Sequence, residues 1–172
     1  MCFSAPASFV AGTALSVLGV VTIRMTLRKA EIPLAMIPLL FGVQQFTEGM
    51  IWLSFRDESP LSNTTLTFVY SLFSHVLWPI FIPFAVGLLE TVPWRKKAVT
   101  VCQIAGTAVG LYLLYIIIQF PVTSLVLGRH IAYESPHFSI VSVVLLYLIA
   151  TCATSLFSRI SAFQVFAGLR VV

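Results

Sequence analysis

Charged residues are scarce in this chain. Only 9% of its 172 residues are Asp, Glu, Lys or Arg, whereas 59% are hydrophobic. A soluble domain of this size needs more polar residues than this to cover its surface. The mean hydropathy of +1.00 therefore favours a protein that is largely embedded in a membrane.

The sequence predicts neither cysteine pairs nor a cleavable leader. Cys2, Cys102 and Cys152 lie far apart, with neither a C-x-x-C pair nor zinc-finger spacing, so a disulfide framework is not expected. No basic stretch precedes the first apolar run, so we expect the first helix to act as an uncleaved signal anchor. The net charge of +4 comes from short basic clusters between apolar runs, a pattern that indicates membrane topology and gives no sign of nucleic acid as a partner.

Five apolar segments approach or exceed the roughly 20 residues that a helix needs to cross a bilayer. We predict spanning helices over residues 7–23, 32–55, 64–89, 98–120 and 138–158. Residues 159–172 are too short to cross again and predict a partial C-terminal helix. The expected fold class is all-α, a multi-pass transmembrane bundle that forms a single domain over residues 1–172.

The longest loop, residues 121–137, has its own pattern. β-branched and apolar residues flank Gly128 and Arg129, which predicts a small β-hairpin, with a re-entrant or interfacial piece as the alternative.

Basic residues are unevenly distributed among the loops. The first, third and fifth loops carry Arg24, Arg28, Lys29, Arg95, Lys96, Lys97 and Arg159, whereas the second and fourth carry only Arg56 and Arg129. Because basic loops remain in the cytoplasm, this asymmetry predicts that the N-terminus lies outside. Membrane lipid is the expected partner.

One acidic residue interrupts the second apolar segment. Glu48 is the only charged residue between positions 32 and 55, and an acid within a membrane helix costs about 2.5–3.5 kcal/mol on insertion scales. Gln44, Gln45 and Trp52 lie four residues before, three before and four after it, so they share its face of the helix. This face predicts either a hydrogen-bonded clasp between helices or the wall of a binding site.

The third apolar segment contains a histidine followed by two prolines. Ser71, His75 and Trp78 lie on one helix face. Pro79 has no N–H, so the carbonyl of His75 loses its helical partner, and Pro83 has the same effect on Pro79. Free backbone at membrane depth lines a cavity or meets a partner. We therefore expect a kink at His75, which is either a packing residue or a ligand.

Candidate metal ligands gather on the expected outer side. They are Cys2, Glu48, His75, His130 and His137. Thiolate, carboxylate and imidazole suit zinc, copper or iron, and one axial histidine suits haem. Removal of Met1 would give Cys2 a free amine beside its thiol, a pair that can chelate a metal; an ordinary packed thiol is the alternative.

Glu48 and His75 are the centre of the predicted pocket. At ~1.5 Å per residue they lie about 10 and 16 Å below the outer ends of neighbouring antiparallel helices, so we predict that they meet, directly or through a water or metal. The expected lining residues are Gln44, Gln45, Trp52, Ser71, Trp78, Tyr133 and Glu134.

A pair of glycines marks the fourth apolar segment. Gly106 and Gly110 form a G-x-x-x-G face, which predicts close packing against another helix or an identical chain.

The chain resembles a family of small multi-pass bacterial membrane proteins that begin Met-Cys-Phe-Ser-Ala. The motifs that carry the resemblance are this opening with Ser8-Phe9, then Phe41-Gly42-Val43-Gln44-Gln45 with Glu48-Gly49 and Trp52, then His75 with Trp78-Pro79 and Pro83. The resemblance covers nearly the whole chain and implies a location in the bacterial inner membrane. The family has no established activity, so it implies no catalytic residue. Its members continue through further helices, which implies that this chain, ending at Val172, is truncated relative to them.

Two further classes of function remain open. The spacing Ser71-x-x-x-His75 resembles part of the pattern of membrane metal-dependent hydrolases of the ceramidase type, which also use a later His-x-x-x-His; His130 and His137 are spaced differently. A small transporter or a structural, lipid-binding protein is the other class, although the sequence shows no inverted repeat.

Overall fold

The computed structural model describes residues 4–57, 59–128, 130–134 and 141–154. The elements follow in the order α1 (Ala5–Met25), a 3-10 turn (Lys29–Glu31), α2 (Ile32–Ala35), α3 (Ile37–Arg56), α4 (Pro60–Ser71), a π-helical segment (Leu72–Leu77), α5 (Trp78–Gly87), α6 (Pro93–Gln119), β1 (Thr123–Leu127), β2 (His130–Glu134), α7 (Val141–Leu148) and a second π-helical segment (Ile149–Ala153). The described chain is mostly helical, with one two-stranded sheet.

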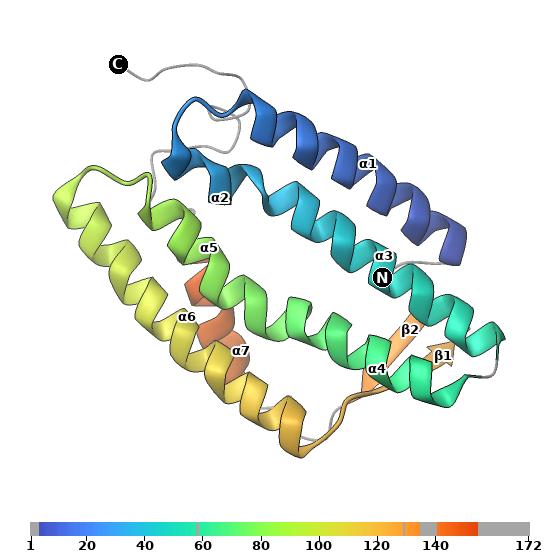
Figure 1. Cartoon of the computed structure of the whole chain (residues 1–172). Helices are drawn as coiled ribbons and strands as arrows, with labels where there is room; N and C mark the ends of the chain where they lie inside the picture. Colours follow the sequence, from blue (N-terminus) through green and yellow to red (C-terminus); the bar gives the residue numbers. More distant parts are fainter. Residues whose placement is uncertain (1–3, 58, 129, 135–140, 155–172) are drawn as a thin grey trace.

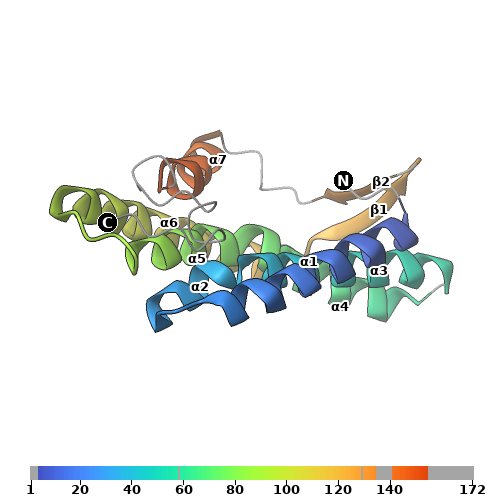
Figure 2. The same cartoon turned by 90° about the horizontal axis from the view of Figure 1, so that it is seen from above.

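The long helices lie side by side in one layer. Helix α1 packs on α3, α3 packs on α4, and α5 packs on α6 (Figure 1). Helix α7 and the β-hairpin lie on the same side of this layer (Figure 2). The α1–α2 and α5–α6 connections share one end of the layer, and the α3–α4 connection and the hairpin lie toward the other end.

Helix starts follow local capping chemistry. Ser4 caps α1, its hydroxyl oxygen accepting from the N–H of Ala7 at 3.4 Å, as its position before the first apolar run predicts. Helices α4 and α6 begin at Pro60 and Pro93, four and five residues before the predicted spans. Proline fits the first helical turn, where its missing N–H leaves no bond unmade, so both helices extend into polar sequence that hydropathy alone assigns to loops.

The second apolar segment is broken, although it was predicted to be continuous over residues 32–55. Helix α2 ends at Ala35 and α3 begins at Ile37. Pro38 has no N–H, so the carbonyl of Leu34 has no i+4 partner there. The neighbouring carbonyl of Ala35 instead accepts a hydrogen bond of 2.9 Å from the hydroxyl of Thr22 in α1, which ties the break to the adjacent helix.

The glycine face of α6 packs tightly against α5. A Cβ placed on Gly106 would collide with the carbonyl oxygen of Pro79, and one on Gly110 would lie 2.8 Å from Cδ1 of Ile80. The carbonyl of Pro79 is the group that Pro83 deprives of a helical partner. The close packing predicted for these glycines is therefore found within the chain, whereas an oligomer formed through them stays a prediction.

The predicted β-hairpin is confirmed. Strands β1 and β2 pair antiparallel, with Thr123 opposite Glu134 and Leu127 opposite His130. Gly128, in the connection, has φ +62°, a conformation that glycine adopts without steric cost.

Four segments of the described chain are long and apolar enough to cross a membrane. They are Ala5–Met25, Lys29–Arg56, Pro60–Gly87 and Pro93–Gln119. A fifth span was predicted over residues 138–158; within its described part the apolar helix Val143–Cys152 is shorter than a span. The predicted partial helix at 159–172 lies outside the described residues.

Candidate functional site

The polar face of α3 meets α5 at Gln44. The indole N–H of Trp78 donates to the side-chain oxygen of Gln44 at 2.9 Å, and both side chains are buried. The Trp78 ring also stacks on Phe41, with ring centroids 4.0 Å apart. One tryptophan thus satisfies its N–H and packs its ring on the same helix, which fixes α5 against α3.

Glu48 lies one turn from Gln44, toward the hairpin end of α3. Its side chain is 1% exposed, the lowest value among the described acidic residues. The amide nitrogen of Gln45 donates to its Oε2 at 3.4 Å, so an adjacent side chain of the same helix supports the carboxyl. A carboxyl at this depth is costly to charge unless it gains hydrogen bonds or a cation.

His75 lies in the π-helical segment that joins α4 to α5. The kink expected here takes the form of a change in helix type over Leu72–Leu77, immediately before Pro79. The Nδ1 atom of His75 is 2.7 Å from the hydroxyl oxygen of Ser74 and 3.3 Å from the carbonyl oxygen of Ser71. π-Helical turns of this kind are frequent at functional sites.

One hydrogen bond sets the level of Glu48 relative to His75. Gln44 and Trp78 are joined directly, so they share a level across α3 and α5. Glu48 lies four residues beyond Gln44, a rise of about 6 Å, and His75 lies three residues before Trp78, a rise of about 4.5 Å. Because the helices are antiparallel, both rises run toward the hairpin end. The two ionisable residues therefore lie at nearly the same depth.

A polar chain continues from this level to the hairpin. The Asn63 amide nitrogen donates to the hydroxyl oxygen of Ser54 at 3.0 Å, which links α4 to α3. The Ser124 hydroxyl donates to the Asn63 amide oxygen at 2.8 Å, and the Thr67 hydroxyl donates to Ser124 Oγ at 2.9 Å. The hairpin is thus bound to two polar side chains of α4, of which Thr67 is buried.

Sequence reasoning did not identify these hydrogen-bonded side chains as part of the site. The available signal was the spacing of Asn63, Thr67 and Ser71, which places three polar residues on one face of α4. The partner, Ser124, had no such signal, because it is distant in sequence and lies among the β-branched residues of the hairpin.

The hairpin and α7 each contribute a tyrosine. Tyr133 of β2 stacks on Tyr70 of α4, with ring centroids 4.5 Å apart and planes 10° from parallel. The hydroxyl of Tyr147 in α7 donates to the carbonyl oxygen of Ser74 at 2.8 Å. The backbone beside His75 is therefore engaged by α7.

Trp52 presents a donor to the interior one turn beyond Glu48. Its indole nitrogen is buried, and among the described residues it has no hydrogen-bond partner. A buried donor without a partner costs about 1–3 kcal/mol, so a bound acceptor at this position would recover that energy.

The other residues predicted for the site lie farther apart from one another. His130 is exposed at the start of β2, three residues from Tyr133, or about 10 Å along the strand. Glu134 is exposed at the strand end. Ser71 is buried and its hydroxyl donates to the Thr67 carbonyl at 2.8 Å. Cys2 and His137 lie outside the described residues.

The described residues do not contain a preformed metal cluster. Within this part of the chain, no group of three or more His, Cys, Asp or Glu side chains could hold a metal ion. Glu48 and His75 provide one carboxyl and one imidazole at similar depth, with the Gln45 amide beside the carboxyl and the Ser74 hydroxyl beside the imidazole. Such a set can hold a proton, hydrogen-bond a polar ligand or supply two ligands to a metal.

The architecture is that of a protein with several helices long and apolar enough to span a membrane, arranged around buried polar side chains. The chain belongs to a family of unknown function, DUF6629, whose model matches residues 1–172. Neither the curated proteins nor the solved structures include a match to this chain.

Proposed function

We propose that this chain is an integral membrane protein whose polar interior binds a transition-metal ion at Glu48 and His75. Helix length supports the membrane location. At ~1.5 Å per residue, the shortest of the four candidate spans, Ala5–Met25, is about 32 Å long, and the bilayer core is about 30 Å thick. Apolar side chains exposed along α1 and α6, such as Val10 (70%) and Val101 (66%), would contact lipid.

Charge distribution supports an orientation with the N-terminus outside. Arg28 and Lys29 near α2 and Lys96 and Lys97 of α6 lie at the end of the layer that holds the α1–α2 and α5–α6 connections (Figure 1). The hairpin lies toward the opposite end. The positive-inside rule assigns the basic end to the cytoplasm and the hairpin to the outer side. The bacterial inner membrane is the location that the sequence resemblance implies.

The observation that carries the proposed site is that Glu48 is buried at nearly the same depth as His75. A carboxyl and an imidazole in otherwise apolar membrane helices mark functional positions by default, because each is costly to keep there. Together they supply the oxygen and nitrogen ligands that zinc, copper or iron accepts. Cys2 and His137 are the candidates for the remaining ligands.

Metal content distinguishes this site from a simple clasp between helices. We expect the purified full chain to retain one of these metals, detected by elemental analysis and, for iron or copper, by visible absorption. Glu48→Gln and His75→Gln should each lose the metal while remaining folded. Glu90→Gln is the matched control, because Glu90 is also buried (5% exposed) but lies in the α5–α6 connection, away from α3.

Three results would contradict the proposal. A wild-type protein that holds no metal and takes none up overturns the proposed site. Loss of metal in Glu90→Gln to the same extent as in Glu48→Gln would show that any buried acid affects binding through stability alone. Failure of the wild type to float with phosphatidylcholine vesicles after alkaline washing would overturn the membrane location separately.

A further inference from the structure

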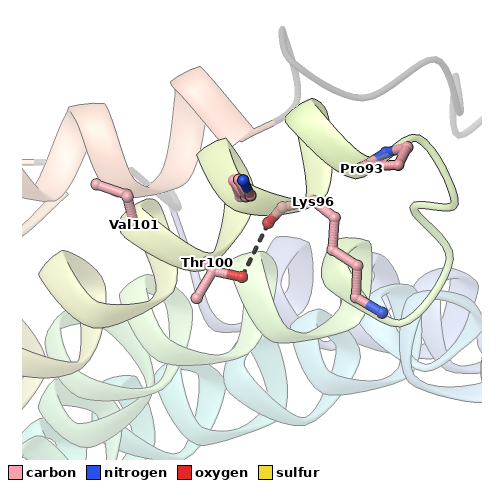
Figure 3. Close-up of a pocket in the computed structure, with 5 residues that line it drawn as sticks. Pro93, Lys96, Thr100 and Val101 are labelled. Carbon is pink, nitrogen blue, oxygen red and sulfur yellow. Dashed lines mark hydrogen bonds between the residues drawn. The ribbon is translucent and has the colours of Figure 1, made fainter.

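A shallow hollow lies over the first two turns of α6. It has a volume of about 470 Å³ and is lined by Pro93, Lys96, Lys97, Thr100 and Val101. Figure 3 shows these residues along one stretch of the helix, where the Thr100 hydroxyl donates to the Lys96 carbonyl at 2.8 Å. The lysines provide charge at the start of the helix, and Val101 provides an apolar surface one turn further along.

The hollow is positively charged, and no acidic residue is among those that line it. Glu90 is 5% exposed; its Oε1 accepts from the N–H of Val92 at 3.0 Å, and its buried Oε2 has no hydrogen-bond partner among the described residues. Glu31, on the neighbouring connection, pairs with Arg28 at 3.3 Å. Helix α6 itself contains no acidic residue, so Lys96 and Lys97 present their charge to a ligand within the hollow.

The surroundings combine an interfacial aromatic residue with an apolar wall. Trp94 is 59% exposed, and the Arg95 guanidinium lies 5.1 Å from its ring centroid. Exposed tryptophan beside basic residues is typical of the headgroup level of a membrane. Val101 and Ile104 continue the exposed apolar surface along α6, in the direction that a lipid chain would follow.

The start of α6 is the positive end of its helix dipole. No described side chain caps this end of the helix, where Val92 is the N-cap residue. The first amide groups of a helix lack partners within it and point outward, and they favour negative charge. In α6, however, Pro93 has no N–H and the Val92 N–H is bound by Glu90, so the positive charge for a phosphate comes from the two lysines.

We propose that this hollow binds an anionic phospholipid, with its phosphate at Lys96 and Lys97 and an acyl chain along Val101 and Ile104. Basic pockets at the cytoplasmic ends of membrane helices bind anionic headgroups in this way. The proposal rests on the membrane location proposed above, and it is independent of the site at Glu48.

Lipid binding by the detergent-purified full chain tests the proposal. Native mass spectrometry during titration with phosphatidylglycerol or phosphatidylcholine would give the affinity for each lipid. We expect preference for phosphatidylglycerol in the wild type. The double variant Lys96→Gln/Lys97→Gln should bind it about 25-fold more weakly, since each lysine near an anionic surface contributes a factor of about five.

A matched pair of basic residues controls for overall charge. Arg24→Gln/Lys29→Gln removes two charges from the same end of the molecule but outside the hollow, and should retain wild-type affinity within about twofold. Equal loss in both double variants, or equal affinity of the wild type for both lipids, would overturn the lipid site. Complete displacement of the lipid by inorganic phosphate would show an anion site with no need for a lipid. Vesicle flotation in phosphatidylcholine alone tests the membrane location without involving the hollow.

Discussion

Trp78 and Gln44 are joined by a hydrogen bond of 2.9 Å between buried side chains 34 residues apart in sequence. This bond connects α5 to α3 one turn below Glu48 and His75. It therefore sets the register between the two helices that places Glu48 and His75 at nearly the same depth. Its loss should change the depth of one residue relative to the other.

Removing this hydrogen bond should destabilise the protein. We expect Gln44→Leu to lower the free energy of unfolding by about 1–3 kcal/mol, because the Trp78 N–H is then buried without an acceptor. A double-mutant cycle with Trp78→Phe, measured by thermal or chemical unfolding in detergent, should give a coupling of about 0.6–1.7 kcal/mol. Strictly additive effects of the two substitutions would contradict the pairing.

The contact between α6 and α5 should tolerate no side chain at Gly106. In Gly106→Ala the added Cβ would collide with the backbone carbonyl of Pro79, and we expect destabilisation of about 1–3 kcal/mol. Gly87→Ala is the control, because it is also a helical glycine but its Cβ would meet only the movable Val99 side chain, at 3.3 Å. The thermal midpoints of both variants measure the difference. Equal midpoints would rule out the tight backbone contact.

The polar chain at Asn63 should hold the hairpin on α4. Ser124→Ala removes bonds to both Asn63 and Thr67, so we expect faster amide hydrogen exchange in β1 and β2 while α1 and α3 keep their protection. Ser59→Ala is a suitable control, because among the described residues its hydroxyl bonds to Ser62 alone, in an exposed position. Unchanged exchange in the hairpin of Ser124→Ala would show that other contacts dock it.

Accessibility labelling tests the proposed orientation. Single cysteines placed at Lys29 and His130, in a background without Cys2, Cys102 and Cys152, should react on opposite sides of the membrane. An impermeant maleimide added to intact cells should label position 130, whereas position 29 should react only after the membrane is permeabilised. The reverse pattern would invert the topology, and labelling of both positions from outside would contradict the proposed arrangement of spans.

Local physical rules account for much of the fold. Apolar runs long enough to cross a bilayer predicted the four long helical segments, and Gly128 between β-branched residues predicted the hairpin. The disturbance at His75 followed from Pro79, since a missing N–H has a consequence four residues earlier whatever the tertiary structure. The break at Met36 follows from the same rule applied to Pro38, a signal that the length of the apolar run obscured.

The arrangement of the site depended on contacts that local rules do not specify. Helical spacing placed Gln44 and Trp78 on the faces expected, but it did not identify them as partners. Ser124 and Thr67 lie 57 residues apart, and their pairing depends on where the hairpin docks. His130 shows the same limit, because a loop histidine can be expected near the pocket from its side of the membrane, yet in the hairpin it is exposed.

The central claim is that Glu48 and His75 form one site, and their separation can be measured directly. In the background without native cysteines, Glu48→Cys/His75→Cys should be joined efficiently by a short bifunctional thiol reagent, seen as an intramolecular mass increase. Met50→Cys/His75→Cys is the control, because Met50 lies on the same helix but is 41% exposed at the surface. Cross-linking in the first pair and its absence in the second is the predicted result. Equal cross-linking in both pairs, or none in the first, would contradict a shared site.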